Sequence, residues 1–132
     1  MIKRDHILRW TQELAKAIGR LMGKETREAL EIIDDIFNDL LEFNPAELDQ
    51  IPPVEWWTYL TTKKALHKGQ LEFLASLLHR QGTLLHETGQ LVESKARLRQ
   101  ALHIFEQLEI EQAVFSFERQ QQMTDIRNKL QE

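Results

Sequence analysis

The chain has 132 residues, of which 42% are hydrophobic and 29% are charged, with a formal net charge of −4 and no cysteine. This composition is that of a folded globular protein, and the length suits a single helical domain over residues 1–132. It excludes disulfides, thiolate metal ligands and cysteine nucleophiles, and the scattered basic residues argue against general binding of nucleic acid.

The sequence contains no targeting or membrane signal. Its apolar runs are shorter than the roughly 18 residues needed to cross a membrane. Residues 1–6 include two basic side chains but lack the apolar core and the cleavage site of a signal peptide. We therefore expect a cytoplasmic protein with no membrane segment.

Apolar residues recur at helical intervals and no segment alternates at period two, so the sequence predicts an all-α fold of about six helices. A first helix at about 5–22 and a second that ends before Asn44 form a hairpin over residues 5–43, turning at Gly23. The expected inward stripe of the first helix comprises Ile7, Trp10, Leu14, Ile18 and Leu21. The broader stripe of the second comprises Ala29, Leu30, Ile33, Ile36, Phe37, Leu40 and Leu41.

Prolines mark the clearest break in the chain. Asn44 with Glu47 resembles a helix-capping pair, which predicts one helical turn over residues 45–48. A short helix is then expected over residues 53–67, with Trp56 and Trp57 on it. Adjacent side chains on a helix point about 100° apart, so the two rings cannot both face one core. The pair either seals the joint or forms an aromatic anchor at a partner interface.

The second half of the chain predicts a hairpin over residues 70–108 and a last helix over 111–130. Gly82 lies where the two helices of the hairpin would press together, and Gly89 closes the first of them. The last helix begins with the apolar residues Ala113, Val114 and Phe117 and then becomes polar. A polar outer face that contacts solvent is typical of the helix that caps a stacked array.

Residues 75–108 resemble a tetratricopeptide repeat, a helix–turn–helix unit of roughly 34 residues. The resemblance rests on Gly82, Gly89 and Ala101, and on Leu98 and Leu102, which lie in the same helix as Ala101. It implies a right-handed stack of antiparallel hairpins.

The resemblance has three departures and a weaker neighbour. Ser94 stands in place of the usual alanine, Leu98 in place of a larger aromatic, and Glu106 in place of the terminal proline. The first hairpin matches less well, with Ala17 at its close-contact position. Residues 1–5 with Leu8 and Arg9 also resemble an uncharacterised family of small bacterial proteins, which implies no activity.

The tetratricopeptide resemblance implies a peptide-binding face on the first helix of the repeat. All five side chains at the corresponding positions are polar, although any solvent-facing helix side would have the same pattern. They are Ser76, His79, Thr83, His86 and Glu87.

Catalytic and metal-binding patterns are lacking in the sequence. His79 and His86 are two helical turns apart, about 10 Å, which is too far for one metal ion to bind both. Asp34, Asp35 and Asp39 form an acidic cluster that is typical of a solvated helix face. The sequence has no Gly-rich phosphate loop and no nucleophile elbow. We therefore expect no enzyme activity, no metal and no cofactor.

The sequence predicts a non-catalytic, tetratricopeptide-like adaptor that binds a protein or peptide along the helix at 70–88. Stacked hairpins usually need three or more units, so a homodimer is also expected to supply missing cover. One alternative is a small regulator of transcription or signalling that contacts nucleic acid through Lys63, Lys64 and Lys68. The other is a metal- or carboxylate-dependent enzyme.

Overall fold

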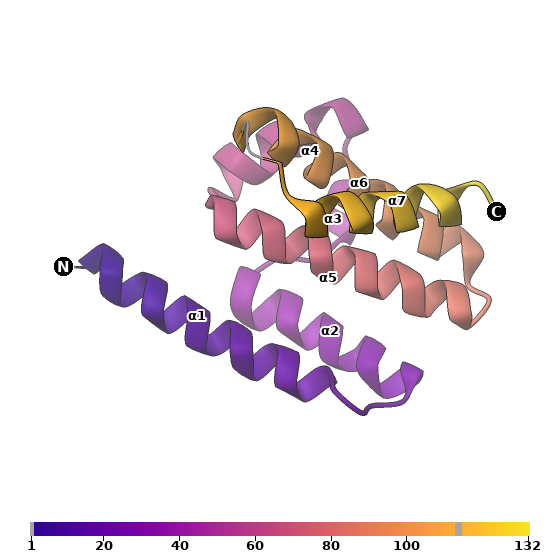
Figure 1. Cartoon of the computed structure of the whole chain (residues 1–132), viewed down its shortest axis with the longest axis horizontal. Coiled ribbons are helices and arrows are strands. Elements are labelled where there is room, and N and C mark those ends of the chain that lie inside the picture. Colours follow the sequence, from indigo (N-terminus) through magenta and orange to yellow (C-terminus); the bar gives the residue numbers. More distant parts are fainter. Residues whose placement is uncertain (1, 113–114) are drawn as a thin grey trace. The chain divides into compact units, whose positions relative to one another are not determined.

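The computed structural model describes the backbone of residues 2–112 and 115–132, and the side chains of residues 12–112 and 115–132. Over these ranges the chain forms helices and no strand, which confirms the all-α class (Figure 1). The helices divide into two compact units, Met1–Glu42 and Phe43–Glu132, and each is described by itself. The expectation of one domain over the whole chain stays a prediction.

The first unit is a pair of helices, α1 (Ile2–Leu21) and α2 (Thr26–Leu41). Gly23 has φ +74°, the left-handed conformation that the turn requires and that glycine adopts at little cost. Among the α1 side chains that the structure describes, Ala17 and Leu21 are buried, whereas Ile18 is half-exposed, so the predicted stripe is wrong at that position. The side chains of Ile7 and Trp10 lie outside the described residues.

The predicted cap at the start of the second unit is confirmed. The Asn44 side chain accepts a hydrogen bond from the Ala46 amide at 2.9 Å, and the Glu47 carboxylate accepts one from the Asn44 amide at 2.8 Å. These bonds satisfy backbone donors that a helix start leaves unpaired, and they precede the single turn α3 (Ala46–Asp49).

The predicted helix over residues 53–67 is broken into three short pieces: η1 (Pro53–Glu55), α4 (Trp56–Thr58) and the π-helical η2 (Tyr59–Lys63). The chain leaves this segment through Ala65, whose φ is +51°. His67 then caps the next helix, because its Nδ1 accepts a hydrogen bond from the Gln70 amide and the Gln70 side chain accepts one from the His67 amide. This reciprocal cap places Gly69 inside the helix that follows, not before it.

The predicted hairpin is present as α5 (Lys68–Glu87) and α6 (Leu91–Gln112), with Gly89 at φ +80° between them. The two helices press together at Gly82. A Cβ atom there would lie 2.6 Å from the Leu98 side chain, so only glycine fits without a shift. The second helix runs beyond the predicted end at residue 108, since Glu106 stands where a proline would have stopped it.

The last helix, α7 (Phe117–Leu130), begins later than the predicted residue 111. Ser116 caps it by accepting a hydrogen bond from the Arg119 amide at 3.2 Å. Ala113 and Val114, which the sequence placed in this helix, lie outside the described residues. Within the second unit, α7 packs against α6 and α5 through its buried residues Met123 and Ile126.

Candidate functional site

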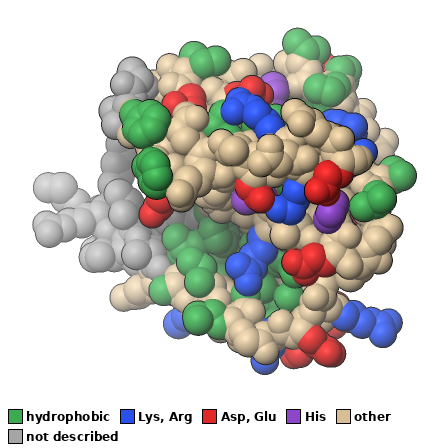
Figure 2. Space-filling model, turned by 45° about the vertical axis from the view of Figure 1, so that its right-hand side comes forward, with side chains coloured by type: hydrophobic (Ala, Val, Ile, Leu, Met, Phe, Trp, Pro, Cys, Tyr) green, Lys and Arg blue, Asp and Glu red, His purple; other side chains and the backbone are tan. Residues whose placement is uncertain are grey.

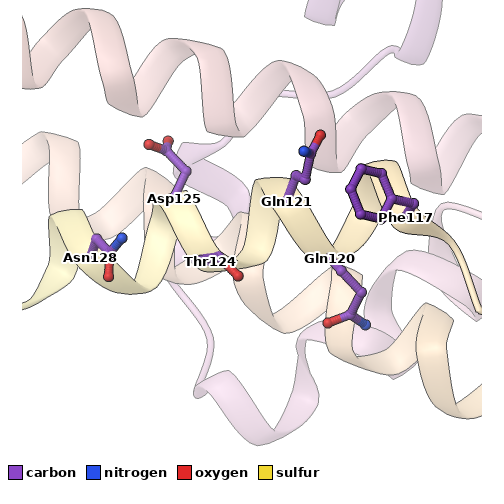
Figure 3. A pocket seen from close by; sticks show the side chains of 6 residues that line it. All are labelled: Phe117, Gln120, Gln121, Thr124, Asp125 and Asn128. Atoms are coloured by element: carbon purple, nitrogen blue, oxygen red, sulfur yellow. The ribbon is translucent and has the colours of Figure 1, made fainter.

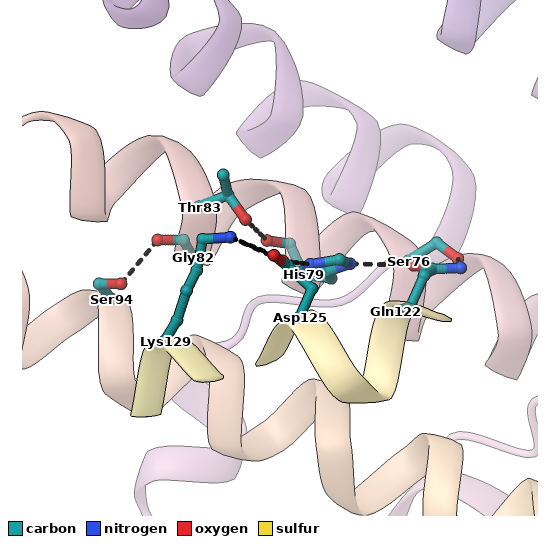
Figure 4. Close-up of polar contacts among 8 residues, drawn as sticks. All are labelled: Ser76, His79, Gly82, Thr83, Ser94, Gln122, Asp125 and Lys129. Carbon is teal, nitrogen blue, oxygen red and sulfur yellow. Dashed lines mark hydrogen bonds and ion pairs between the residues drawn. The ribbon is translucent and has the colours of Figure 1, made fainter. Parts of the chain in front are cut away.

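The predicted binding face of α5 is turned toward α7. The Nε2 atom of His79 lies 2.6 Å from a carboxylate oxygen of Asp125, and its Nδ1 atom lies 3.0 Å from the side-chain oxygen of Gln122 (Figure 4). The amide nitrogen of Gln122 also donates to the hydroxyl of Ser76, at 3.4 Å. Two of the five predicted residues are therefore engaged by side chains of the same chain.

The remaining predicted residues of this face behave differently from one another. The Nε2 atom of His86 lies 2.6 Å from a carboxylate oxygen of Glu132, just beyond the end of α7. Thr83 donates to the carbonyl of His79 within its own helix, at 2.9 Å. Glu87 is exposed. An outside partner at His79 or His86 would have to compete with Asp125 or Glu132, so the assignment of this face to partner binding stays a prediction.

Asp125 is the centre of the contact between α5 and α7. Besides His79, it accepts two hydrogen bonds from the Nζ atom of Lys129, at 2.6 and 2.7 Å (Figure 4). Partial burial acts to raise the pKa of Asp125, but the hydrogen bonds from Lys129 and His79 outweigh it and lower the pKa below the ordinary value of 3.8. The carboxylate is thus ionised at neutral pH, and it joins His79 of α5 to Lys129 of its own helix through hydrogen bonds.

The two adjacent tryptophans occupy different environments. Trp56 is buried, donates through Nε1 to the Leu48 carbonyl at 2.9 Å, and lies edge-on to His103 with ring centroids 5.5 Å apart. Burial lowers the pKa of His103, although Glu106 acts in the opposite direction. Trp57 is half-buried. Trp56 therefore lies in the core of the second unit, and the assignment of the tryptophan pair to a partner interface stays a prediction.

A buried arginine joins the three long helices of the second unit, and sequence reasoning did not find it. Arg119 is 4% exposed, and its guanidinium donates to Glu109 at 2.6 Å, to Gln112 at 2.7 Å and to Glu72 at 3.0 Å. The sequence gives no signal for it, because an arginine in a polar helix is usually exposed. Arg119 fixes the start of α7 against the end of α6.

A second arginine network lies between α3 and α6. Arg97 makes a bidentate pair with Asp49 at 3.0 and 3.1 Å, and Gln100 donates to the same carboxylate at 2.7 Å. A fork-to-fork pair of this kind fixes orientation as well as charge. Gln100 also accepts a hydrogen bond from Arg97 at 3.0 Å, and the buried Nε of Arg97 is the one donor of this network that lacks a partner among the described residues. We assign the network to packing of the core.

Three large and exposed apolar side chains lie where α6 gives way to α7. Ile110 is 71% exposed, Phe115 71% and Phe117 65%, and we call these three residues the 110–117 patch. The sequence had placed Phe117 on the apolar start of the last helix. Figure 2 shows one face of the molecule, on which apolar side chains lie at the surface among acidic and basic ones.

One side of α7 is hollowed next to this patch. The hollow is lined by side chains from a single helix, mostly uncharged and polar, with an aromatic ring at one end: Phe117, Gln120, Gln121, Thr124, Asp125 and Asn128 (Figure 3). Amide and hydroxyl groups of this kind can both donate and accept hydrogen bonds. They offer polar contacts beside the exposed ring of Phe117.

The geometry gives little support to the other two candidate sites, the lysine surface for nucleic acid and a metal site. Lys63 belongs to η2 and Lys68 to α5, so the three lysines do not share one helix face, and Lys64 lies 3.4 Å from Glu47. Among the described residues no three histidine or acidic side chains gather as metal ligands would. Within the same ranges, every helix is too short or too polar to span a membrane.

No family model, curated protein or solved structure matches the chain significantly. The resemblance of residues 75–108 to a tetratricopeptide repeat therefore stays a prediction, and no family assignment follows.

Proposed function

We propose that the chain is a non-catalytic, tetratricopeptide-like adaptor that binds a protein or peptide, and that its partner covers the 110–117 patch. The exposure of Ile110, Phe115 and Phe117 is the observation that carries this proposal. Exposing several large apolar side chains in one short segment costs solubility, and such patches mark interaction sites. Aromatic residues are also enriched among the side chains that contribute most to binding.

The close helical hairpin supports the tetratricopeptide-like part of the proposal. The contact of Gly82 with Leu98 and Ser94 lets the two backbones approach, and α7 adds a third helix with a polar outer side. In stacked repeats each hairpin contacts its neighbours, and a polar terminal helix closes the array. We infer the same role for α7.

The patch is held ready for binding. The hydrogen bond from the Arg119 amide to Ser116 fixes the backbone between the two phenylalanines, and the guanidinium of Arg119 anchors the start of the helix to Glu109 and Gln112. Ordering a surface before binding reduces the entropy that association must overcome. A preorganised patch suits specific recognition better than a loose one.

Affinity capture from a lysate tests the proposal when wild type is compared with the double variant Phe115→Ser/Phe117→Ser. The matched control is Val92→Ser, since Val92 is 89% exposed and lies at the start of α6. We expect partners that are lost with the double variant and kept with the control, at unchanged circular dichroism. Identical partner sets for all three proteins would contradict the assignment.

The two alternative functions, a regulator that contacts nucleic acid and a metal- or carboxylate-dependent enzyme, would give different experimental results. A regulator that contacts nucleic acid would bind random duplex DNA with a steep salt dependence, which Lys63→Gln/Lys68→Gln would weaken. An enzyme that depends on a metal would retain stoichiometric metal on purification. We expect neither, and either result would favour that alternative over the adaptor.

Self-association is a further way to cover the patch. Light scattering across concentration measures it directly. A dimer that the Phe115→Ser/Phe117→Ser variant dissociates would identify a second copy as the partner. A dimer that the variant leaves intact would place the self-contact elsewhere.

A further inference from the structure

We infer that the 110–117 patch takes a basic amphipathic segment of a partner protein: its apolar side chains cover Phe115 and Phe117, and its Lys or Arg side chains face Glu111 and Glu118. This inference rests on the proposed function and specifies the chemistry of the partner.

The charged side chains of the segment that carries the patch all have one sign. Residues 106–118 contain four glutamates and no lysine or arginine. Two of the four are matched from α7, because Glu109 pairs with Arg119 at 2.6 Å and Glu106 lies 3.5 Å from Arg127. The other two, Glu111 and Glu118, are exposed and form no ion pair with any described residue. We call these two carboxylates, Glu111 and Glu118, the acidic rim of the patch, and no described residue compensates their charge.

The backbone presents the two rings together. Ser116 is extended, at φ −120° and ψ +115°, and in an extended chain the residues on either side of a position point to the same side. Phe115 and Phe117 therefore form one apolar surface, with Glu118 directly after it. Ile110 and Glu111 repeat the pairing of an apolar side chain with a carboxylate at the end of α6.

The same charges disfavour two other occupants. Symmetric pairing of the patch with a second copy would bring equivalent glutamates of the two chains close together. An anionic membrane surface would repel Glu111 and Glu118. A segment with both apolar and basic side chains compensates the rim and covers the rings, and opposite charges across an interface also speed association.

Two synthetic amphipathic peptides of about 18 residues test the inference. They share one leucine pattern, and carry either lysine or glutamate at the remaining charged positions. Fluorescence anisotropy with the full chain should show binding of the lysine peptide, weakening as salt rises, and no binding of the glutamate peptide.

Variants separate the apolar and the charged contributions. We expect Phe115→Ser/Phe117→Ser to weaken binding of the lysine peptide about tenfold or more. Glu111→Gln/Glu118→Gln should weaken it about threefold and flatten its salt dependence. The control Glu55→Gln/Glu93→Gln removes the same charge from exposed positions elsewhere and should bind as wild type does.

The outcomes distinguish failure of the inference from failure of the proposed function. Equal binding of both peptides, equal effects of the two glutamate pairs, or binding to anionic vesicles that Phe115→Ser/Phe117→Ser abolishes would each overturn the basic-segment inference. A captured partner that needs Phe115 and Phe117 but binds the Glu111→Gln/Glu118→Gln variant as well as wild type would also overturn the basic-segment inference. The adaptor proposal would stand in that case. If no partner and no peptide depends on the phenylalanines, both are wrong.

Discussion

The hydroxyl of Ser94 on α6 lies 2.6 Å from the carbonyl oxygen of Gly82 on α5 and donates a hydrogen bond to it. This bond crosses the point where the two helices are closest, and Ser94 is fully buried. A residue that the repeat pattern treats as a small substitute for alanine therefore also contributes a polar contact between the helices.

Replacement of Gly82 by alanine should destabilise the second unit. The new Cβ would lie 2.6 Å from Leu98, which is buried, and 3.2 Å from the carbonyl oxygen of Ser94. Overpacking of this kind lowers the free energy of unfolding by about 1–3 kcal/mol. Urea denaturation followed by circular dichroism measures it.

Gly19→Ala is the control for that substitution, since a Cβ at Gly19 meets no atom within 4 Å among the described residues. It should leave stability unchanged or raise it by about 0.5–1 kcal/mol, because alanine favours the helical state. Equal effects of the two substitutions would contradict the close crossing at Gly82.

Arg119→Met should be strongly destabilising, because it removes the buried guanidinium and leaves its three hydrogen-bond acceptors without a donor. Breaking a fully buried pair costs about 3–5 kcal/mol, and we expect about 2–3 kcal/mol here because Glu72 and Glu109 keep some contact with water. The control is Arg127→Met, whose ion pair is half-exposed and 3.5 Å long, with an expected effect of less than about 0.5 kcal/mol. Chemical denaturation that ranks the two variants alike would refute the role of Arg119.

Tyr59 gives a spectroscopic prediction, as it is the chain's single tyrosine. Its hydroxyl donates a hydrogen bond to Glu47, and this bond, with burial and the carboxylate charge, raises the pKa of Tyr59 above 10.0. The corresponding stabilisation is present below the ordinary pKa of tyrosine and is lost as pH rises through the raised value. Ultraviolet absorbance of the phenolate follows the titration.

Glu47→Gln should move that titration back toward the ordinary value, because it removes both the charged acceptor and the repulsion. Lys64→Gln is the control, since it removes the ammonium group that lies 3.4 Å from Glu47 and keeps the carboxylate that raises the pKa of Tyr59. An unchanged phenolate titration in Glu47→Gln would exclude the Tyr59–Glu47 bond as the cause.

Asp125→Asn should loosen α7. The carboxylate is half-exposed, so its ion pairs contribute about 0.5–1 kcal/mol, and amide protons of α7 should exchange about two- to fivefold faster. The lowered pKa of Asp125 means that this contribution is present above pH 3.8 and is lost as pH falls through the lowered value. Hydrogen exchange near neutral pH measures the difference. Gln121→Ala, on the outer side of the same helix, should exchange as wild type does, and an equal acceleration would count against the Asp125 contacts.

The parts of the fold that sequence predicted correctly depend on local signals. Gly89 and Gly23 mark turns because few other residues adopt positive φ, and the Asn44–Glu47 pair marks a helix start within four residues. Gly82 stands out because a glycine inside a helix usually has a packing reason. Each of these signals was readable without knowledge of the rest of the chain.

The parts that sequence missed depend on contacts between distant residues or on competing local signals. His79 meets Gln122 across 43 positions, and no periodicity of either helix encodes that meeting. The start of α7 was misplaced because the apolar run at 113–117 suggested a continuous helix, although Ser116 was available as a cap. With these residues assigned to a continuous helix, the sequence did not predict that Phe115 and Phe117 are exposed.

Photo-crosslinking in cells tests the adaptor proposal most directly. Benzoylphenylalanine replaces Phe115 in the patch, Glu87 on the predicted face of α5, or Val92 as an exposed control. We predict a covalent adduct with a partner protein from position 115 alone, suppressed by excess wild-type chain but not by excess Phe115→Ser/Phe117→Ser. No adduct from position 115, or an equal adduct from position 87 or 92, would contradict the account.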